Sequence, residues 1–391
     1  MLRTKIFSNT QGRKNAMELI FEREDLLEAM QVVGNIAASR NTLPILANVL
    51  IRATEEHIQL AATDLEVGVK SLVEGEIKEP GSITIPARKL ADIARELPVS
   101  SASGDPVKVS LKTSASDRVE IECENARFRM VGLSDEEFPP LPEIGDEFIS
   151  LESDLMNNMI QKTVFAVSTE ETRHFLNGIY LSINSDTVKM VATDGKRLAV
   201  AINKEDGVSD KEIGVIIPTK AVNNVLRTFT EDGEVKVALL ENQIAFASEK
   251  MTLISRLIEG DYPDTEAVMS PTMSNEIKVT ANTDHLLSVV RRVSLLANPK
   301  TPSIRMETNE SELSISASTP ELGEAKEQIQ VDHEGGSIEI AFNARYVLDV
   351  LRNIESEKVL FKFRDSLSPV LVMPSDETEV TYMCVIMPMR L

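Results

Sequence analysis

The most constraining feature of this 391-residue chain is a short motif that returns at nearly equal intervals. The central copy, VATDGKRLAV, runs from Val191 to Val200, with echoes at Ala62 to Val67 (ATDLEV) and Ala317 to Leu322 (ASTPEL). The alanines of the three copies lie 130 (192 − 62) and 125 (317 − 192) residues apart. Repetition at a fixed interval predicts one structural unit written three times.

Other local signals recur at the same interval. The strand-like segment Ile83 to Pro86 matches Val215 to Pro218, and Phe138-Pro139-Pro140 matches Tyr262-Pro263-Asp264. Each repeat contains alternating apolar segments typical of strands and two amphipathic segments typical of helices. The sequence therefore predicts an α+β fold of three repeated domains, which we place at residues 17–143, 144–271 and 272–391.

Residues 1–16 differ from the rest of the chain. They are polar and aperiodic, which predicts a disordered leader or an upstream start, with Met17 a second start. They contain no apolar core of a secretory signal, and no apolar run in the chain is long enough to span a membrane. Cys123 and Cys384, the two cysteines, are too few for a disulfide framework. We therefore expect a cytoplasmic protein.

The net charge of −21 argues against nucleic-acid binding, unless the basic residues gather on one face. Two basic residues do recur on the second helix of every repeat, at fixed distances from the inward residues Ile93, Val225 and Val350. Five residues before and two residues after these positions stand Arg88 and Arg95, Lys220 and Arg227, and Arg345 and Arg352.

The members of each basic pair are nearly two helical turns apart, so they share one helix face. Lys89, Arg291, Arg292 and Lys300 lie nearby in the sequence. For a single residue, a solvated helix face is the simpler interpretation. Threefold recurrence in a chain with 62 acids and 41 bases instead favours phosphate contact without sequence reading. Among the recurring pairs only Arg345 and Arg352 have an aromatic residue between them, Tyr346, so base stacking is not indicated.

No catalytic constellation emerges. The four histidines, His57, His174, His285 and His333, are scattered without metal-ligand spacing, and no nucleotide-binding or nucleophile motif occurs. The residues therefore indicate no metal site and no catalytic centre.

Two segments depart from the repeat and are candidates for function. Thr193-Asp194 is shared with the first copy, whereas Gly195-Lys196-Arg197 occurs in the middle copy alone, as an anion-binding turn or a plain strand-end turn. The tail Met387 to Leu391 is rich in methionine, which suits either core packing or an exposed surface that accepts several ligands.

The chain resembles a known family, the beta subunit of bacterial DNA polymerase III, the sliding clamp. The resemblance covers Met17 to Leu391 and leaves out residues 1–16. The segments that carry it are Leu43-Pro44-Ile45-Leu46, Phe175-Leu176-Asn177-Gly178, Ala192 to Val200, Tyr262-Pro263-Asp264, Tyr346 to Leu351 and Val385 to Leu391.

The resemblance implies helices packed on antiparallel sheets and a head-to-tail homodimeric ring. Such a ring encircles duplex DNA without sequence specificity, and an ATP-driven clamp loader places it there. The resemblance implies no cofactor for the ring and no catalysed reaction. It tethers the DNA polymerase III catalytic subunit and other replication and repair proteins that carry a short binding motif. An acidic outside and a basic channel would reconcile the net charge with DNA binding.

The resemblance also implies particular residues. Arg40 and Arg173 resemble family DNA contacts, whereas the repeat supplies the other DNA-facing candidates: Arg88, Lys89, Arg95, Lys220, Arg227, Arg291, Arg345 and Arg352. A client-peptide pocket between the second and third domains would consist of Leu176, Thr193, Gly195, Lys196, Arg197, Leu198, Pro263, Val268 and Val385, with Asn343, Tyr346, Leu367, Met387, Pro388, Met389 and Arg390 adjoining. The family commonly has histidine where this chain has Lys196, a difference that bears on client preference.

Two alternatives remain open at this point. One is an enzyme that uses Asp194, Lys196 and Arg197 on a phosphorylated substrate. The other is an acidic three-domain adaptor with no role on DNA. The absence of a paired acid, base or nucleophile argues against the first, and the recurring cations argue against the second.

Overall fold

The computed structural model describes residues 17–37, 43–100, 104–114, 116–209 and 212–390. The predicted leader, Arg40 and Leu391 lie outside these residues. The described residues form two compact units, and each is treated by itself. Unit 1 contains the residues up to Phe148 together with Arg227–Phe229 and Val235–Arg256. Unit 2 contains Ile149–Leu226, Thr230–Glu234 and the residues from Leu257 onward.

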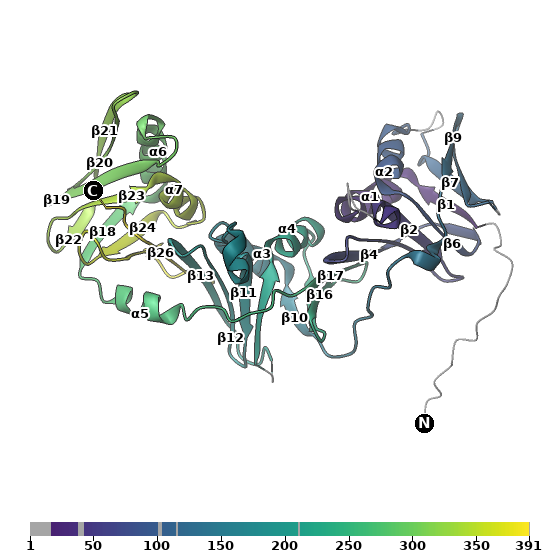
Figure 1. Cartoon of the computed structure of the whole chain (residues 1–391), viewed down its shortest axis with the longest axis horizontal. Helices are drawn as coiled ribbons and strands as arrows, with labels where there is room; N and C mark the ends of the chain where they lie inside the picture. Colours follow the sequence, from purple (N-terminus) through teal and green to yellow (C-terminus); the bar gives the residue numbers. More distant parts are fainter. Residues whose placement is uncertain (1–16, 38–42, 101–103, 115, 210–211, 391) are drawn as a thin grey trace. The chain divides into compact units, whose positions relative to one another are not determined.

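Unit 1 consists of two antiparallel sheets with two helices (Figure 1). The helices are α1 (Arg23–Ile36) and α2 (Ala87–Glu96), with short 3-10 turns η1 (Pro44–Ala47) and η2 (Asp135–Glu137). The strands are β1 (Glu18–Glu22), β2 (Asn48–Ala53), β3 (Ile58–Thr63), β4 (Val67–Val73), β5 (Glu76–Glu79), β6 (Gly81–Pro86), β7 (Lys108–Thr113), β8 (Arg118–Cys123), β9 (Ala126–Val131), β15 (Glu234–Leu239), β16 (Gln243–Ala247) and β17 (Met251–Arg256).

The first sheet of unit 1 has the order β5-β1-β7-β8-β9, and the second runs β15-β16-β17-β4-β3-β2-β6. Helix α1 packs against α2, β3 and β4. Its residues Leu26, Met30 and Val33 are buried, which confirms the helix face that the apolar spacing predicts.

Unit 2 also consists of antiparallel sheets with helices packed on them (Figure 1). Its helical segments are α3 (Ser153–Val164), η3 (Glu171–Leu176), α4 (Thr219–Thr228), α5 (Glu266–Met273), α6 (Thr283–Val293), η4 (Ser294–Leu296) and α7 (Ala344–Arg352). Its strands are β10 (Ile149–Glu152), β11 (Gly178–Ile183), β12 (Thr187–Thr193), β13 (Arg197–Lys204), β14 (Ile213–Pro218), β18 (Ile277–Asn282), β19 (Ser303–Asn309), β20 (Glu312–Thr319), β21 (Gly323–Gln330), β22 (Asp332–Glu334), β23 (Glu339–Asn343), β24 (Lys358–Phe363), β25 (Val370–Pro374) and β26 (Thr381–Ile386).

A nine-stranded sheet in unit 2 has the order β14-β11-β12-β13-β26-β25-β24-β18-β22, and a four-stranded sheet has the order β21-β20-β19-β23. Helix α3 packs on β12 and β13, and α6 packs on β20 and β21 beside α7. The fold is therefore α+β with helices packed on antiparallel sheets, as the sequence predicts.

Sheets continue from one repeat into the next. Strand β17 of the middle repeat pairs with β4 of the first, and β26 of the third pairs with β13 of the middle. Because main-chain hydrogen bonds run across each junction, neighbouring repeats share one sheet. This pairing explains why residues 235–256 group with unit 1, although they belong to the middle repeat.

Two local features differ from what the sequence predicts. On an amphipathic helix a lysine is predicted to lie in water, yet Lys162 on α3 is 6% exposed, and its Nζ lies 3.2 Å from Glu355 Oε1 and faces the ring of Tyr382. Helix α5 was not expected, since it is short and contains Pro271. It begins after Asp264, whose Oδ1 accepts from the backbone N–H of Glu266 at 3.0 Å.

Candidate functional site

The repeated motif forms the hairpin turn between β12 and β13 in unit 2. Thr193 Oγ1 donates to the carbonyl of Arg197 at 2.6 Å and accepts from Gly195 N–H. Asp194 Oδ1 accepts from the N–H groups of Lys196 and Arg197 at 2.8 and 3.0 Å. Gly195 has φ +81°, the left-handed conformation that glycine adopts without strain. The Thr-Asp pair therefore closes the turn and leaves Lys196 and Arg197 as its variable part.

The first copy uses the same turn chemistry between β3 and β4. Thr63 Oγ1 donates to the carbonyl of Val67 at 3.0 Å, and Asp64 Oδ1 accepts from Val67 N–H at 2.9 Å. Leu65 takes the place of the glycine at φ +78°. The third copy also turns between strands, yet Thr319 Oγ1 donates to the carbonyl of Leu296 instead. Thr-Asp is thus shared scaffold in two copies, as the sequence predicts.

Arg197 connects three segments of unit 2. Its Nε lies 3.2 Å from Asp194 Oδ2 in its own turn, and its Nη1 lies 2.7 Å from Asp349 Oδ2 on α7. Its Nη2 donates to the carbonyl of Phe165 at the end of α3. The guanidinium carbon is 4.6 Å from the ring centroid of Tyr346 and 5.2 Å from that of Phe165. The side chain is 11% exposed, so these contacts are largely shielded from water.

The tail after β26 lies beside this turn. The backbone N–H of Met387 donates to the carbonyl of Lys196 at 2.9 Å, and that of Met389 donates to the carbonyl of Ala341 at 2.7 Å. Met387 is 40% exposed, whereas Pro388 and Met389 are half-buried. The tail is therefore held by its backbone and keeps part of its apolar surface in water.

An apolar cluster lies behind the tail and the turn. Buried residues of β12, β13, α5, β25 and β26 form it: Val191, Leu198, Val200, Met269, Leu371, Met383 and Val385. Three apolar side chains among the predicted pocket residues nevertheless remain in water: Val268 is 42%, Leu367 69% and Met387 40% exposed. Exposed apolar groups of this size are candidates for ligand contact.

The structure places the predicted client-pocket residues in three classes. Leu176, Thr193, Leu198 and Val385 are buried. Half-buried members are Arg197, Asn343, Tyr346, Pro388 and Met389, and exposed ones are Gly195, Lys196, Pro263, Val268, Leu367, Met387 and Arg390.

A cavity of about 550 Å³ shares Lys196, Arg197 and Tyr346 with the predicted pocket. Its other walls come from the end of α3, the segment Val167–Glu170, and Asn177, Asp194 and Thr219. Apart from Asp194, none of these wall residues is a candidate from the sequence. The sequence shows that Asp194 and Arg197 lie close together in one turn. It does not show that α3 and α7 approach this turn, because that approach depends on tertiary packing.

Glu170 connects a predicted DNA-facing residue with the turn. Its Oε2 accepts from Arg173 Nη2 at 2.7 Å, and its Oε1 lies 3.9 Å from Lys196 Nζ. The hydrogen bond from Arg173 lowers the pKa of the Glu170 carboxyl below its ordinary value. A Cβ on Gly195 would lie 2.8 Å from Arg173 Nη1, so this guanidinium lies directly beside the turn.

The recurring cations occupy equivalent helix positions. Helices α2, α4 and α7 begin at Ala87, Thr219 and Ala344, and their second residues and those seven further on are the six predicted cations. All six are exposed: Arg88, Arg95, Lys220, Arg227, Arg345 and Arg352.

The partners of these cations differ. Arg95 lies 3.4 Å from Asp92, and Arg352 lies 3.1 Å from Asp349. Arg88, Arg227 and Arg291 form no ion pair with the part of the chain that the structure describes.

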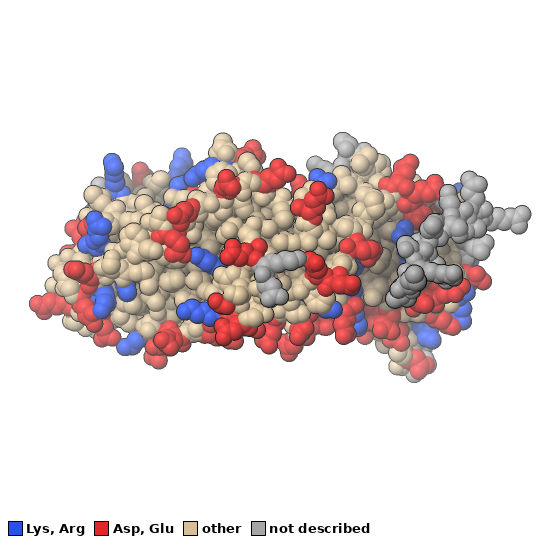
Figure 2. Space-filling view, turned by 90° about the horizontal axis from the view of Figure 1, so that it is seen from below, with Lys and Arg blue, Asp and Glu red and all other residues tan. Residues whose placement is uncertain are grey.

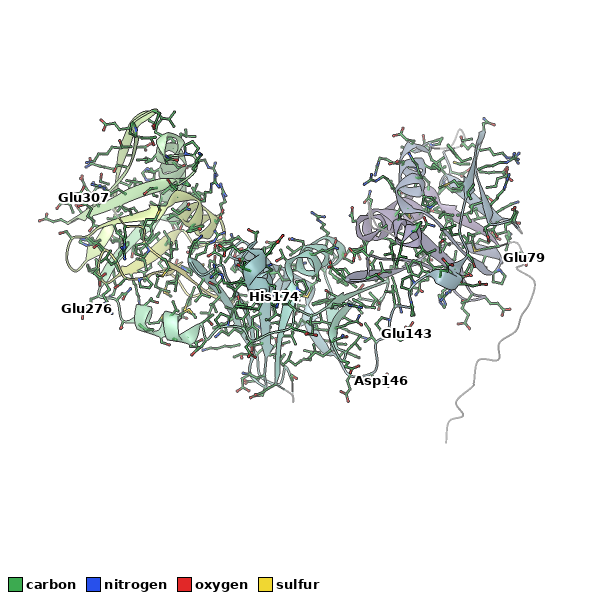
Figure 3. All side chains as sticks on the ribbon, in the orientation of Figure 1. Glu79, Glu143, Asp146, His174, Glu276 and Glu307 are labelled. Carbon is green, nitrogen blue, oxygen red and sulfur yellow. The ribbon has the colours of Figure 1, made fainter. Side chains whose placement is uncertain are left out.

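Exposed acids are numerous elsewhere. On the face in Figure 2, Asp and Glu side chains are spread across the surface with Lys and Arg between them. Glu79, Glu143 and Asp146 of unit 1 and Glu276 and Glu307 of unit 2 are all exposed (Figure 3). The net charge of −21 is thus carried on surfaces other than the basic helix positions.

Within the described ranges, no group of three or more His, Cys, Asp or Glu side chains could hold a metal ion. No helix among them is long and apolar enough to cross a membrane.

The fold and the site define a class of protein: repeated α+β domains that share sheets, carry cations at two matching helix positions, and expose apolar side chains beside a specialised turn. The chain belongs to the DNA polymerase III beta subunit family, the sliding clamps. The N-terminal, central and C-terminal domain models of that family match residues 17–142, 150–264 and 271–390.

Individual relatives agree with this assignment. The Beta sliding clamp of Pseudomonas aeruginosa is 35% identical and covers 96% of this chain and 100% of its own length. That of Chlamydia muridarum is 31% identical, with coverage of 96% and 99%.

Solved structures are similar as well. The P. aeruginosa clamp bound to griselimycin has a TM-score of 0.89 at 34% identity, and the Bacillus subtilis DNA polymerase sliding clamp has a TM-score of 0.90 at 28%. Both cover 96% of this chain and 100% of the matched chain. The family that the sequence resembles is therefore confirmed.

Proposed function

We propose that this chain is the processivity factor of a bacterial replicative DNA polymerase. Two copies form a closed ring of six domains around duplex DNA, slide without reading sequence, and hold the polymerase at its template. The ring catalyses no reaction and acts in the cytoplasm, where an ATP-driven clamp loader opens and places it. We place the three domains of each copy at residues 17–143, 144–271 and 272–391.

The observation that carries the DNA role is the repeated cation on α2, α4 and α7. Backbone contacts from exposed Arg and Lys neutralise phosphates and position a protein without specifying sequence. A motif of this kind at matching positions of three repeats suits a ligand whose charge is the same all along its length. Arg173 and Lys89 extend the predicted contact set, as do Arg291 and, outside the described residues, Arg40.

The shared sheets support ring closure. In both junctions within the chain, the strand after the motif turn pairs with the last strand of the next repeat: β4 with β17, and β13 with β26. Strand β21 follows the motif turn of the third repeat, and β9 is the last strand of the first repeat. Each is an edge strand of its sheet, so neither is paired in the way that its equivalents are. We propose that β21 of one copy pairs with β9 of the other, and that two such contacts close the ring.

The side chains around these edges fit association. Leu295, in η4 beside β21, is 74% exposed, and Val131 at the end of β9 is 72% exposed. Exposed edge strands with adjacent apolar groups favour pairing with another chain. Arg127 and Arg129 on β9 are also opposite in charge to Glu324 and Glu327 on β21, although Lys326 shares that strand.

The internal junctions suggest the register. Strands β4, β13 and β21 begin at Val67, Arg197 and Gly323, and the first two of these pair with Ser255 and Ile386. Isolated bridges join Leu133 to β6, Ile258 to β14 and Met389 to β23, which are equivalent strands of the three repeats. The residues three positions before these bridges are therefore equivalent as well: Met130, Ser255 and Ile386. Gly323 would then face Met130, and Glu324 would face Arg129.

The second role is client binding. We propose that short peptides with apolar ends bind on the surface made by the predicted pocket residues, beside the 193–197 turn and the tail. Support comes from the exposed Val268, Leu367 and Met387, and from a buried apolar cluster to which Met269, the chain neighbour of Val268, belongs. Lys196, with its side chain 61% exposed beside Glu170, makes this edge of the surface ionic and biases client choice.

One experiment tests the ring. The chain, a clamp loader and ATP are incubated with nicked circular DNA, and protein retained on the DNA is measured before and after the circle is cut. A ring is lost from the linear form through its ends. Equal retention on circular and linear DNA would contradict the topological model and leave simple electrostatic binding.

A further inference from the structure

The guanidinium of Arg197 is already bonded within this chain. Nε, Nη1 and Nη2 each donate to a different segment of this chain, and the faces of the guanidinium lie near two aromatic rings. A guanidinium in this state gains a ligand carboxylate only by giving up bonds that it already makes. Its charge is therefore committed to Asp194 and Asp349.

The other sheet junction lacks this arrangement. Strands β4 and β17 pair in the same register as β13 and β26, with the buried Val67 in the place of Arg197. Aligned on the inward residues of the second helices, Asp349 corresponds to Asn224 and Tyr346 to Ala221. A shared sheet thus forms without the arginine, so the contacts of Arg197 are additional to what the junction needs.

The additional contacts lie where the proposed client surface lies. Arg197 ties α7, through Asp349, to the motif turn, and its guanidinium carbon lies over the Tyr346 ring. Tyr346 is half-buried and lines the cavity together with Lys196. A planar, charge-paired group between a helix and a turn fixes both distance and orientation.

We propose that Arg197 is a positioning residue for the client surface: through Asp349 it holds Tyr346 of α7 against the 193–197 turn, and it does not act as a charged contact to the ligand. The inference rests on the proposed client-binding role. Asp349 becomes part of the binding apparatus, although its carboxylate is directed to Arg197 and Arg352.

The first test is a double-mutant cycle on the full chain, with griselimycin as the probe. Asp349→Asn is expected to weaken griselimycin binding about tenfold, because the pair loses its charge and the ring its orientation. Arg197→Gln is expected to weaken it at least as much, because it also removes the bonds to Asp194 and to the carbonyl of Phe165. The double variant should bind no more weakly than Arg197→Gln, because the Asp349 carboxylate then has no guanidinium to hold. Isothermal titration gives the affinities, and thermal unfolding confirms that each variant is folded.

Arg197→Lys separates positioning from charge. Lysine keeps the charge but cannot donate to three segments from one plane. Positioning predicts that Arg197→Lys binds as weakly as Asp349→Asn, whereas direct charge contact predicts near wild-type affinity.

Glu355→Gln is the matched control. It removes the ion-pair partner of the buried Lys162 on α3, a residue that faces the ring of Tyr382. We expect some loss of thermal stability with unchanged griselimycin affinity. If Glu355→Gln weakens binding as much as Asp349→Asn does, general loosening explains the effect and the positioning role is refuted.

A spectroscopic measurement reports the tyrosine directly. The chain has four tyrosines, so 3-fluorotyrosine labelling gives a simple ¹⁹F spectrum, in which Tyr346→Phe identifies the resonance of Tyr346. Asp349→Asn should shift or broaden this resonance, and Glu355→Gln should not. An unshifted Tyr346 resonance together with wild-type affinity in Asp349→Asn overturns the inference. If the wild-type chain binds neither griselimycin nor a short peptide with an apolar end, the proposed client surface itself is contradicted.

Discussion

The backbone N–H of Met387 lies 2.9 Å from the carbonyl oxygen of Lys196, so the tail of the third repeat is fastened to the turn that distinguishes the middle repeat. Two departures from the repeat therefore meet at one place. The tail is fastened on its other side by the bond from Met389 to Ala341. Backbone bonds hold the segment, while its side chains remain available to a ligand.

Deletion of residues 387–391 tests the role of this segment. We expect binding of a short peptide with an apolar end to fall below detection, because the deletion removes the exposed Met387 and uncovers the cluster around Val385. Size-exclusion chromatography should show an unchanged oligomer, since neither β9 nor β21 is altered. Retention of wild-type affinity would show that the ligand binds elsewhere.

Gly195 gives a prediction about the turn itself. Gly195→Ala places a side chain at φ +81°, and the new Cβ meets the end of Arg173. We expect a loss of about 1 kcal/mol in unfolding free energy, since Arg173 is flexible and gives way. Denaturant unfolding measures the loss.

The first copy supplies the matched control, because Leu65 already occupies the equivalent position at φ +78°. Leu65→Gly relieves that strain and should leave stability equal or higher. A larger loss for Leu65→Gly than for Gly195→Ala would refute this account of the turn.

Much of this architecture was accessible from the sequence because the repeats reinforce one another. Arg88 and Arg95 on a single helix could simply belong to a solvated face. Cations at matching positions of three helices instead indicate a feature that the repeats share. The Thr-Asp turn was also predictable, since its hydrogen bonds are local.

Other features depend on contacts that no local pattern encodes. The burial of Lys162 requires Glu355, which is distant in sequence, and the contacts of Arg197 require α3 and α7 to converge. The sharing of sheets between repeats was likewise not predicted, because strand pairing between repeats leaves no periodic signal.

The unpaired cations lead to a prediction about salt dependence. Replacing Arg88, Arg227 and Arg291 with glutamine should reduce the slope of log Kobs against log salt concentration by about 0.9 for each phosphate that the protein no longer neutralises. Binding to duplex oligonucleotides at several salt concentrations measures the slope. The reduction should be the same for unrelated DNA sequences, because phosphate contacts carry no sequence information.

Arg305→Gln serves as the control for this series. Arg305 is half-exposed and paired with Glu339, and it lies on a strand rather than on one of the basic helices. We expect its slope to equal that of the wild type. If Arg305→Gln changes the slope as much as one of the three helix substitutions, the overall charge of the protein accounts for DNA binding and the helix positions have no special role.

The last prediction concerns the register of the proposed ring contact, in which Glu324 of one copy faces Arg129 of the other. A chain with Arg129→Cys and Glu324→Cys should form a covalent dimer under mild oxidation, because directly opposed residues of antiparallel strands bring their Cβ atoms within about 5.5 Å. Each single variant should remain uncrosslinked.

The native thiols should not interfere, since Cys123 and Cys384 are buried and burial raises the pKa of Cys384 to about 12. Arg129→Cys combined with Gln328→Cys is the control for register, because Gln328 lies four residues further along β21, about 13 Å away. Crosslinking of that pair in preference to Arg129–Glu324 would show a shifted ladder, and a monomer in every variant would refute β9–β21 pairing. If the Arg129→Cys, Glu324→Cys ring is loaded onto circular DNA and then oxidised, it should remain on the circle after the protein is denatured. This result would connect the strand register to the ring topology that the function requires.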